Sequence, residues 1–412
     1  MAAQEGIRLG SSRGTALRNI IRLIPAVVVI AATLNTVSCN GSDTLFPMVH
    51  GGGGGGSKSP TATPTAGTGS LAFVTNFNDA MVSSFTRNTS SGALTLTGQV
   101  KAGANQGPRG VVASPNGNFL YVANIKDDKI YEFSVNQTTG ALTPLLTPSI
   151  SNGNATQPDE LAINPAGTLL WVTGRQAGTV TAYTISGSSG QLTKKSSIGG
   201  FHTPFGIAVH PTLAVIYVSD LGTGLIQPMS YNTKTGALAK NFLAVGSSDP
   251  LAVMPALITI DAAGDALFVP DEGNGEVSPF AINTATGALT QGTAQANISV
   301  TTAPLGIGIG TNTGVEYVFT ANFGAGSVSS FIITSGTTVI SPPTVASGYS
   351  APKGLVVDPQ NAFVYAADSG NGTVSESIIK GACGFNICAG PTVPTESPAK
   401  PGSGPFGITL TR

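Results

Sequence analysis

The sequence predicts an all-β fold: a seven-bladed β-propeller of four-stranded antiparallel blades, closed by a C-terminal strand that pairs into the N-terminal blade. The first observation is a short aromatic-bearing strand that recurs seven times beyond residue 70. Its aromatic positions, spaced by 46 to 51 residues, are Phe73, Tyr121, Trp171, Tyr217, Phe268, Phe319 and Tyr365. A unit repeated at such a period is typical of a solenoid or propeller, in which each unit is stable only when stacked on its neighbours.

The second observation is the composition of the unit. An apolar strand opening with a proline phrase precedes the aromatic strand, as in GPRGVVA at 107–113. An alternating strand follows it, as in KIYEFSV at 129–135, and then a glycine turn leads into a last strand, as in TGALTP at 139–144. Four short strands joined by Gly, Asn and Asp turns form an antiparallel meander, which is one propeller blade.

The third observation concerns the two ends of the repeat array. The first blade begins at Ser70 without a proline-phrase strand, whereas GPFGITL at 404–410 is such a strand with no blade after it. Docking the second onto the first completes the seventh sheet and leaves no open seam. We therefore expect the last ten residues to be essential for the stability of the whole ring.

The N-terminal residues 1–38 are typical of a lipoprotein signal peptide. Four arginines precede an apolar run, Leu23 to Leu34, that is too short to span a bilayer comfortably. The run ends in Thr-Val-Ser-Cys39, which resembles a bacterial lipobox whose cysteine is lipidated. An ordinary secretory signal is the alternative, and both interpretations export the protein. We expect an exported lipoprotein of the cell envelope, facing the periplasm or in the outer membrane.

Residues 39–69 form a predicted flexible linker, because the Gly-rich and Pro/Thr-rich pieces there cannot bury enough surface to offset the entropy of ordering. Residues 70–412 form the propeller. Charged residues make up only 9% of the chain, and 19 Lys and Arg against 20 Asp and Glu give a net charge of -1. No basic field exists to attract phosphate backbones, so no nucleic acid is expected as a partner. We expect a monomer tied to the membrane by its lipid.

Three cysteines are present. With Cys39 lipidated, Cys383 and Cys388 remain as a candidate disulfide in an oxidising compartment. A metal site is the alternative, although it would need ligands from elsewhere in the chain. We expect neither a metal nor a cofactor. The sequence contains no GxSxG elbow, no HExxH motif and no P-loop.

The repeated phrases YVAN at 121–124, YVSD at 217–220 and TGALT at 139–143 resemble those of the YVTN and lactonase-type propellers. That family includes bacterial 6-phosphogluconolactonase, and the resemblance covers residues 70–412. It implies a seven-bladed fold and, for active members, hydrolysis of a lactone.

The resemblance also implies where catalytic residues would lie. Active members carry a Pro-His-x-His phrase in one blade, and Pro-Arg-His followed by Asn-Glu-Leu in the next. Here Phe205 and Ala256 follow the corresponding prolines, while Glu272 is retained and His202 lies just before its phrase. Lactone opening needs a base for water and a cation or donor for the oxyanion. The candidate catalytic residues are therefore Glu272, Arg109 and His202.

The loops that enter the innermost strands should surround one mouth of the central channel. The residue after each proline is a natural lining position, which gives Arg109, Asp159, Phe205, Ala256, Leu305, Lys353 and Phe406. Of these, Arg109, Asp159, Phe205, Lys353 and Phe406 are the candidate ligand-binding residues. They could hold a small molecule such as a sugar or lactone, or a protein ligand. Hydrated side chains with no ligand are the alternative.

Three functions stay open. The first is a binding or interaction scaffold with depleted catalytic phrases, and the second is an active lactone hydrolase of the 6-phosphogluconolactonase type. The third is a purely structural surface protein, which differs from the first only in lacking a ligand. Other notable polar residues have structural interpretations. Asp220, Asp271 and Asp368 share a repeat position with asparagines, which predicts turn capping. His210 precedes a proline in a turn between strands and is expected to be exposed, whereas Trp171 is expected in the core.

Overall fold

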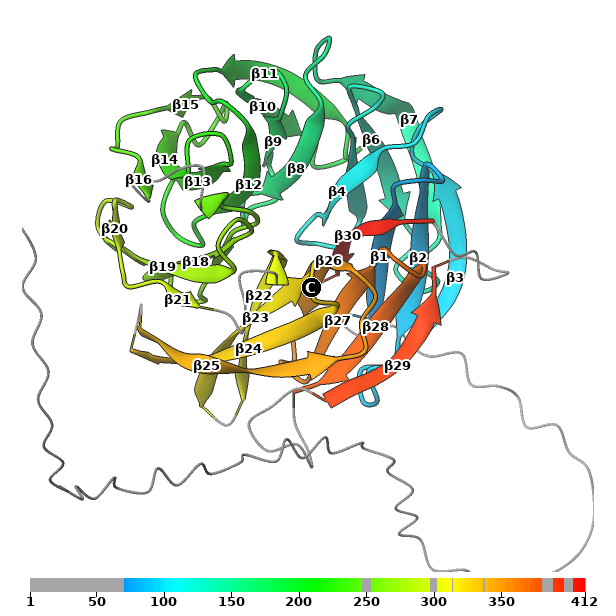
Figure 1. Ribbon diagram of the computed structural model, residues 1–412. Helices are drawn as coiled ribbons and strands as arrows, with labels where there is room; N and C mark the ends of the chain where they lie inside the picture. The colour runs from blue at the N-terminus through cyan, green and yellow to red at the C-terminus, as the bar shows by residue number, and fades with distance from the viewer. Residues whose placement is uncertain are drawn as a thin grey trace, which may run out of the picture. The chain divides into compact units, whose positions relative to one another are not determined.

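Seven antiparallel sheets are arranged in a ring in the computed structural model, which describes residues 70–246, 253–296, 302–312, 314–335, 338–379, 388–395 and 403–411 (Figure 1). The predicted seven-bladed propeller is confirmed. The predicted signal peptide, linker and lipidated Cys39 lie outside the described residues, as does Cys383 of the predicted Cys383–Cys388 disulfide. Among the described residues, no helix combines the length and hydropathy needed to cross a bilayer.

The first three blades follow the predicted order of four strands from the axis outward. Blade 1 consists of β30 (Pro405–Leu410), β1 (Leu71–Asn76), β2 (Met81–Arg87) and β3 (Leu94–Lys101). Blade 2 consists of β4 (Pro108–Ala113), β5 (Phe119–Asn124), β6 (Lys129–Val135) and β7 (Leu142–Ser151). Blade 3 consists of β8 (Pro158–Ile163), β9 (Leu169–Gly174), β10 (Thr179–Ile185) and β11 (Leu192–Ile198).

Blades 4 and 5 differ in having a divided outer strand. Blade 4 consists of β12 (Pro204–Val209), β13 (Val215–Asp220), β14 (Leu225–Tyr231), β15 (Leu238–Ala239) and β16 (Val245–Gly246). Blade 5 consists of β17 (Thr259–Ile260), β18 (Ala266–Asp271), β19 (Glu276–Ile282), β20 (Leu289–Gln291) and β21 (Gln295–Ala296).

Blades 6 and 7 return to the four-strand pattern. Blade 6 consists of β22 (Pro304–Asn312), β23 (Val315–Asn322), β24 (Ser327–Ser335) and β25 (Thr338–Ser347). Blade 7 consists of β26 (Pro352–Val357), β27 (Phe363–Asp368), β28 (Thr373–Ile378) and β29 (Cys388–Pro394).

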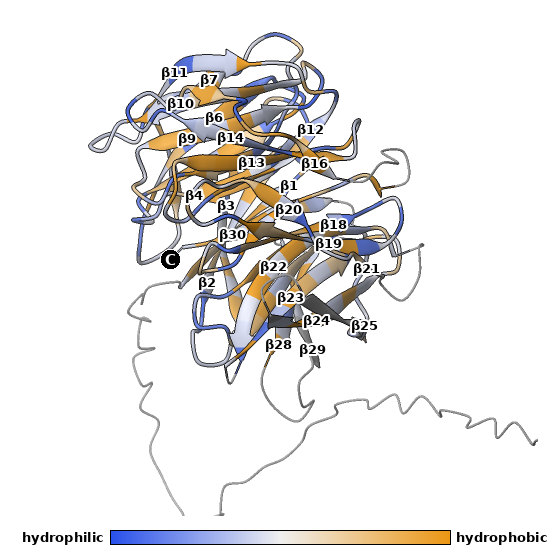
Figure 2. Cartoon of the chain, turned by 90° about the vertical axis from the view of Figure 1, so that its left-hand side faces the viewer, coloured by the Kyte–Doolittle hydropathy of each residue, from blue (hydrophilic) through white to orange (hydrophobic). Residues whose placement is uncertain are grey.

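The core lies between blades. Each interface between neighbouring blades holds its own cluster of buried apolar side chains, as between blades 3 and 4, where Trp171 and Val180 meet Ile216 and Met229. The aromatic strand of a blade is covered on both faces, and all six residues of β1, β9, β13, β18 and β27 are buried. Viewed from the side, apolar segments are concentrated in the strands (Figure 2). Stacking is what buries these strands, as the repeat predicts.

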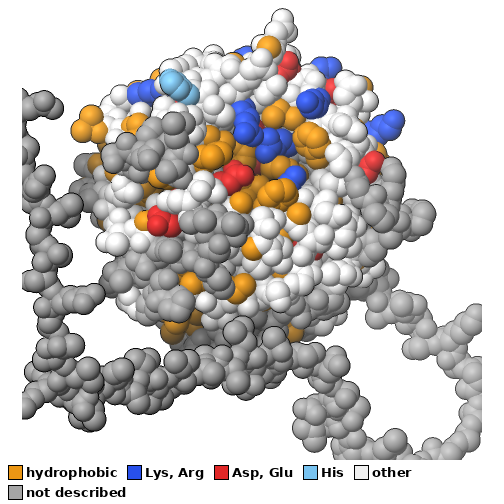
Figure 3. Space-filling view, in the orientation of Figure 1, with side chains coloured by type: hydrophobic (Ala, Val, Ile, Leu, Met, Phe, Trp, Pro, Cys, Tyr) orange, Lys and Arg blue, Asp and Glu red, His pale blue; other side chains and the backbone are white. Residues whose placement is uncertain are grey.

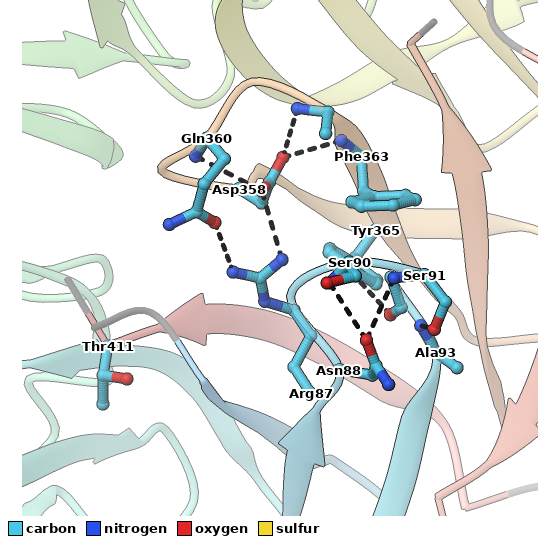
Figure 4. Close-up of polar contacts among 12 residues, drawn as sticks. Arg87, Asn88, Ser90, Ser91, Ala93, Asp358, Gln360, Phe363, Tyr365 and Thr411 are labelled. Carbon is cyan, nitrogen blue, oxygen red and sulfur yellow. Dashed lines mark hydrogen bonds and ion pairs between the residues drawn. The ribbon is translucent and has the colours of Figure 1, made fainter. Parts of the chain in front are cut away.

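The ring closes as predicted, because β30 pairs antiparallel with β1. A second contact joins blades 1 and 7: the Arg87 guanidinium lies 3.1 Å from a carboxylate oxygen of Asp358 and donates to Gln360 at 2.6 Å (Figure 4). Both charged side chains are fully buried. Removing one partner of a buried ion pair leaves an uncompensated charge, so this contact is costly to break at the seam.

Two polar predictions have different outcomes. The turn-capping role of the repeated Asp is confirmed at Asp220, whose carboxylate accepts the backbone N–H groups of His202 and Thr203 at 2.8 and 2.7 Å. The expected exposure of His210 is wrong, since only 1% of the residue is exposed. Its Nδ1 accepts the backbone N–H of Leu213, and its Nε2 bonds the Gly264 carbonyl of the next blade at 2.8 Å.

Candidate functional site

The residues after the inner-strand prolines form a ring round the axis, which we call the inner ring (Arg109, Asp159, Phe205, Ala256, Leu305, Lys353, Phe406). The pairing of each inner strand with the neighbouring aromatic strand is interrupted just after the proline. The register shifts between Pro108 and Val111 in blade 2 and between Pro204 and Ile207 in blade 4. The skipped residues form a bulge, a device that re-aims side chains away from the sheet. Inner-ring residues are thereby released from strand pairing.

A second ring follows the aromatic strands. In every blade, the residue after the repeated Asn, Asp or Gly donates its backbone N–H to the carbonyl of the residue that precedes the inner-strand proline, as Arg175 does to Gln157 at 3.0 Å and Glu272 to Met254 at 3.0 Å. We call these residues the second ring (Phe77, Ile125, Arg175, Leu221, Glu272, Phe323, Ser369). The shared hydrogen bond places one second-ring residue beside one inner-ring residue in each blade.

The strongest polar contact of the two rings is a carboxylate between two guanidiniums. Arg109 Nε lies 3.0 Å from one oxygen of Asp159, and a terminal nitrogen of Arg175 lies 3.3 Å from the other. The Asp159 side chain is fully buried, while Arg109 is 12% and Arg175 31% exposed. Burial raises the pKa of Asp159, and the two guanidiniums oppose that rise. One buried acid thus orients two cations, and the cluster carries a net positive charge.

Aromatic rings support these cations. The Arg109 guanidinium lies 4.0 Å from the ring centroid of Phe406 and 5.4 Å from that of Phe205. The Arg175 guanidinium lies 5.3 Å from the same Phe205 centroid. Lys353 Nζ lies 5.2 Å from Phe406. Contacts of this kind stabilise a cation by about 0.5–2 kcal/mol and hold it in place.

Two further acids lie near the cations. Glu272 favours the charged forms of both Arg109 and Lys353, whose pKa values are otherwise lowered by burial. Glu160 occupies the third position of its proline phrase, where blade 2 has Gly110. Burial raises the pKa of Glu160, neighbouring Asp159 adds to the rise, and Arg109 opposes it. Acids and cations therefore share this mouth (Figure 3).

The other inner-ring residues are apolar. Phe205, Leu221, Ala256, Leu305 and Phe406 form one buried cluster, with Leu257 against it. Phe205 and Ala256, which follow the prolines of the family's catalytic phrases, are thus part of a hydrophobic floor. His202 has an exposed side chain. In the described part of the chain, no hydrogen bond or ion pair joins the His202 side chain to the cations.

The structure brings several of the sequence-predicted site residues together, while their binding and catalytic roles stay predictions. Arg109, Asp159, Phe205, Lys353 and Phe406 all lie at one mouth, and Glu272 joins them. Sequence reasoning missed Arg175, Phe323 and Glu160. A signal existed for the first two, since they share the repeat position of Glu272, one residue past the end of the aromatic strand. Within the described residues no group of His, Cys, Asp and Glu is arranged to hold a metal ion.

Comparison with known proteins agrees with this architecture. The sequence profile of the family "Lactonase, 7-bladed beta-propeller" matches residues 52–153, 110–204 and 216–405. No curated protein sequence matches the chain significantly. A Bacteroides fragilis structure provisionally assigned as a 6-phosphogluconolactonase is similar, with a TM-score of 0.71 at 16% identity, covering 85% of this chain and 99% of that one.

A second solved structure is the periplasmic gluconolactonase PpgL of Pseudomonas aeruginosa, with a TM-score of 0.66 at 14% identity over 83% of this chain and 99% of that one. At such identities the likeness concerns the fold. The profile match covers most of the propeller and includes the blades that carry both rings. The chain belongs to the family of lactonase-type seven-bladed β-propellers.

Proposed function

We propose that this chain is an exported, membrane-anchored propeller that binds a small molecule carrying a carboxylate group at the mouth defined by the two rings. The observation that carries the proposal is the Arg109–Asp159–Arg175 cluster, together with Lys353, which lies near the same Phe406 ring as Arg109. Arg109, Arg175 and Lys353 face the acids Asp159 and Glu272, and one positive charge remains at neutral pH because burial raises the pKa of the third acid, Glu160, to about 8. Guanidinium groups held in fixed orientations suit the two oxygens of a carboxylate.

The proposal includes depleted catalysis. Phe205 and Ala256 stand after the prolines where active lactonases of this type carry the histidine and arginine phrases, and both are buried in an apolar floor. An apolar floor can neither take a proton from water nor hold an oxyanion. The ligand would therefore be bound rather than transformed.

Binding of gluconate, measured by isothermal titration calorimetry, tests this proposal. Arg175→Gln should weaken gluconate binding at least about tenfold, because it removes one charged partner worth about 1.5–3 kcal/mol. Lys195→Gln is the matched control, since it removes an exposed cation on the outer strand β11. Equal binding by the Arg175 and Lys195 variants would rule out the mouth as the site.

An active lactone hydrolase is the second candidate, favoured by the influence of Glu272 on both Arg109 and Lys353. In this reaction Glu272 accepts a proton as the water oxygen attacks the lactone carbonyl carbon. The ring C–O bond then breaks and its oxygen takes a proton, giving a hydroxy acid. Turnover of gluconolactone that is lost in Glu272→Gln and kept in Glu276→Gln, from the same hairpin, would establish hydrolysis.

Export and anchoring rest on the sequence of the first 39 residues. The arginine-rich start, the short apolar run and Cys39 support a lipid-modified N-terminus. Mass spectrometry of the mature protein tests this: the expected N-terminus is a diacylglyceryl-modified Cys39. An N-terminus at any other residue, without lipid, would leave an ordinary secretory signal as the explanation.

A further inference from the structure

The mouth has a polar half, which also contains the apolar ring residues Phe77, Ile125 and Phe406, and an apolar half. Blades 2, 3 and 7 supply the charged inner-ring residues Arg109, Asp159 and Lys353, and blade 3 adds Arg175. Blades 4, 5 and 6 supply an apolar arc whose ring residues are Phe205, Leu221, Ala256, Leu305 and Phe323. Glu272 is the one charged ring residue in that arc. A ligand with polar groups on all sides would bring some of them against this apolar arc without hydrogen-bond partners.

The apolar arc is exposed at two positions. Phe323, in the hairpin between β23 and β24, is 39% exposed, and Met254, just before Pro255, is 37% exposed. They belong to the few large apolar side chains that the described surface shows to solvent. Both lie at the mouth, because Phe323 N–H bonds the Ala303 carbonyl at 3.1 Å and the Met254 carbonyl accepts the N–H of Glu272 at 3.0 Å.

A cation connects the apolar arc to the polar half. Lys353 Nζ lies 5.0 Å from the ring centroid of Phe323 and 5.2 Å from that of Phe406. A ligand whose anionic group reached Lys353 could therefore cover the exposed ring of Phe323 with an apolar portion. A polyhydroxylated chain placed there would lose water from its hydroxyl groups without hydrogen-bond partners from Phe323 or Met254.

We infer that the preferred ligand is amphipathic: a carboxylate, or the hydroxy acid formed from a lactone, that carries an aliphatic chain or aromatic ring. Its anionic group contacts Lys353 and the Arg109–Arg175 pair, and its apolar part covers Phe323 and Met254. The inference rests on the proposed function, since it assumes that the mouth binds a ligand, and it goes further by placing that ligand outside the polyhydroxylated sugar acids.

The test compares the affinities of the purified protein for octanoate and gluconate, measured by isothermal titration calorimetry. Both ligands are carboxylates, and the carbon chain is hydroxylated only in gluconate. We expect octanoate to bind more tightly. Phe323→Ser should weaken octanoate binding about fivefold to tenfold, as expected for the loss of roughly half of an aromatic contact area, and should weaken gluconate binding by a smaller factor. Met254→Ser should act in the same direction. Leu146→Ser is the matched control, because Leu146 is 96% exposed on the outer strand β7.

The remaining outcomes separate this inference from the proposed function. Gluconate binding that depends on Arg175 and exceeds octanoate binding would overturn the inference and keep the mouth as an anion site. Octanoate binding that is equally weakened by Phe323→Ser and Leu146→Ser would also overturn it. Failure of both carboxylates to bind would overturn the inference together with the proposed function.

Discussion

At the scale of single residues, the repeated aromatic position does more than fill the core. Tyr121, Trp171, Tyr217 and Tyr365 each donate a hydrogen bond to a glycine carbonyl in the next blade, in the turn before that blade's outer strand. Those glycines, Gly190, Gly236, Gly287 and Gly92, have φ between 72° and 85°, a conformation that glycine adopts without strain. The aromatic residue therefore connects two blades by packing and by a hydrogen bond. Phe73, Phe268 and Phe319 can supply only the packing.

Replacing Tyr217 by Phe should lower the free energy of unfolding by about 1 kcal/mol, because it leaves the buried Gly287 carbonyl without its 3.0 Å partner. Tyr317→Phe is the matched control: this ring is equally buried, and its hydroxyl has no hydrogen-bond partner in the described structure. Removing that hydroxyl should be neutral or slightly stabilising. Denaturant unfolding measures the stability of both variants. Equal changes in the two free energies of unfolding would contradict this account.

The residue at the repeated Asn or Asp position determines whether stability depends on pH. Asn76 and Asn322 donate to Ser83 and Ser329 at 2.8 and 2.7 Å, while in blade 5 Ser278 donates to Asp271 instead. Burial raises the pKa of Asp271 from 3.8 to about 7, and nearby Glu276 adds to the rise. The folded protein therefore keeps a proton that the unfolded chain loses near pH 4.

The contribution of Asp271 to the free energy of unfolding should fall as the pH rises from about 4 to 7, because the folded state binds the proton more tightly than the unfolded state does. Above pH 7 the contribution should stay level. Asp271→Asn keeps the shape and removes the titration. As the pH rises, the free energy of unfolding of the variant should increase relative to that of the natural protein, by on the order of 2 kcal/mol at pH 8. Thermal unfolding measured at pH 4.5, 6 and 8 checks this, and a stability difference that is independent of pH would contradict it.

At the scale of elements, the inner strands are packed closely enough to require glycine. In Pro-x-Gly phrases the glycine faces a carbonyl of the next blade: a Cβ on Gly206 would lie 2.4 Å from the Ala256 oxygen, and one on Gly407 would lie 2.3 Å from the Arg109 oxygen. Hydroxyl groups connect the same strands. Ser219 accepts the Gly206 N–H at 2.8 Å and donates to the Ala256 carbonyl at 2.6 Å.

Gly206→Ala should therefore destabilise the protein by about 1–3 kcal/mol, since backbone atoms of two blades would have to separate. Gly98→Ala, in the outer strand β3, is the matched control, because a Cβ there meets nothing within 4 Å. It should change stability by no more than about 0.5 kcal/mol. Similar denaturant midpoints for the two variants would refute close packing of the inner strands.

The divided outer strands of blades 4 and 5 also have a local cause. Pro228 and Pro279 lie within the third strands, opposite Tyr217 and Phe268. The Pro279 carbonyl accepts the Gly292 N–H, so Pro279 faces the outer strand with its hydrogen-bonding groups. A continuous outer strand would also need an N–H from this residue, and proline has none. The outer strand of blade 5 is accordingly divided between β20 and β21.

At the scale of the whole molecule, the ring depends on its seam. The strand β30 pairs with β1 through Ala72 and Phe73, and Thr411 N–H bonds the Leu71 carbonyl at 3.0 Å. The buried pair of Arg87 and Asp358 lies at the same junction of blades 1 and 7. Loss of β30 would expose the edge of β1 and the apolar side chains of the neighbouring interface.

Deleting residues 403–412 should therefore make all seven blades susceptible to limited proteolysis, instead of blade 1 alone. A synthetic peptide of the deleted sequence, added in excess, should restore protection, because it supplies the missing strand. Protection of blades 2 to 7 in the truncated protein without peptide would mean that the blades are stable independently of closure.

Much of the fold could be predicted from the sequence, because a blade is a local object. Its four strands, its glycine turns and its aromatic position recur within about 50 residues and obey the two-residue period of strands. Closure was predictable for the same reason, since one strand type was missing at the start and left over at the end. The candidate site was partly predictable: knowing that proline phrases enter the inner strands was enough to name the inner ring.

The tertiary structure alone decided how the side chains of different blades meet. Arg109, Asp159 and Arg175 come from two blades, and only the radial arrangement brings both guanidiniums to one carboxylate. His210 was expected in solvent, yet it is buried because the next blade offers the Gly264 carbonyl. The burial, charge state and partners of a side chain depend on neighbours about 50 residues away along the chain, which no local pattern encodes. The sequence by itself determined the blades and their number, and the packing between blades determined the chemistry of the mouth.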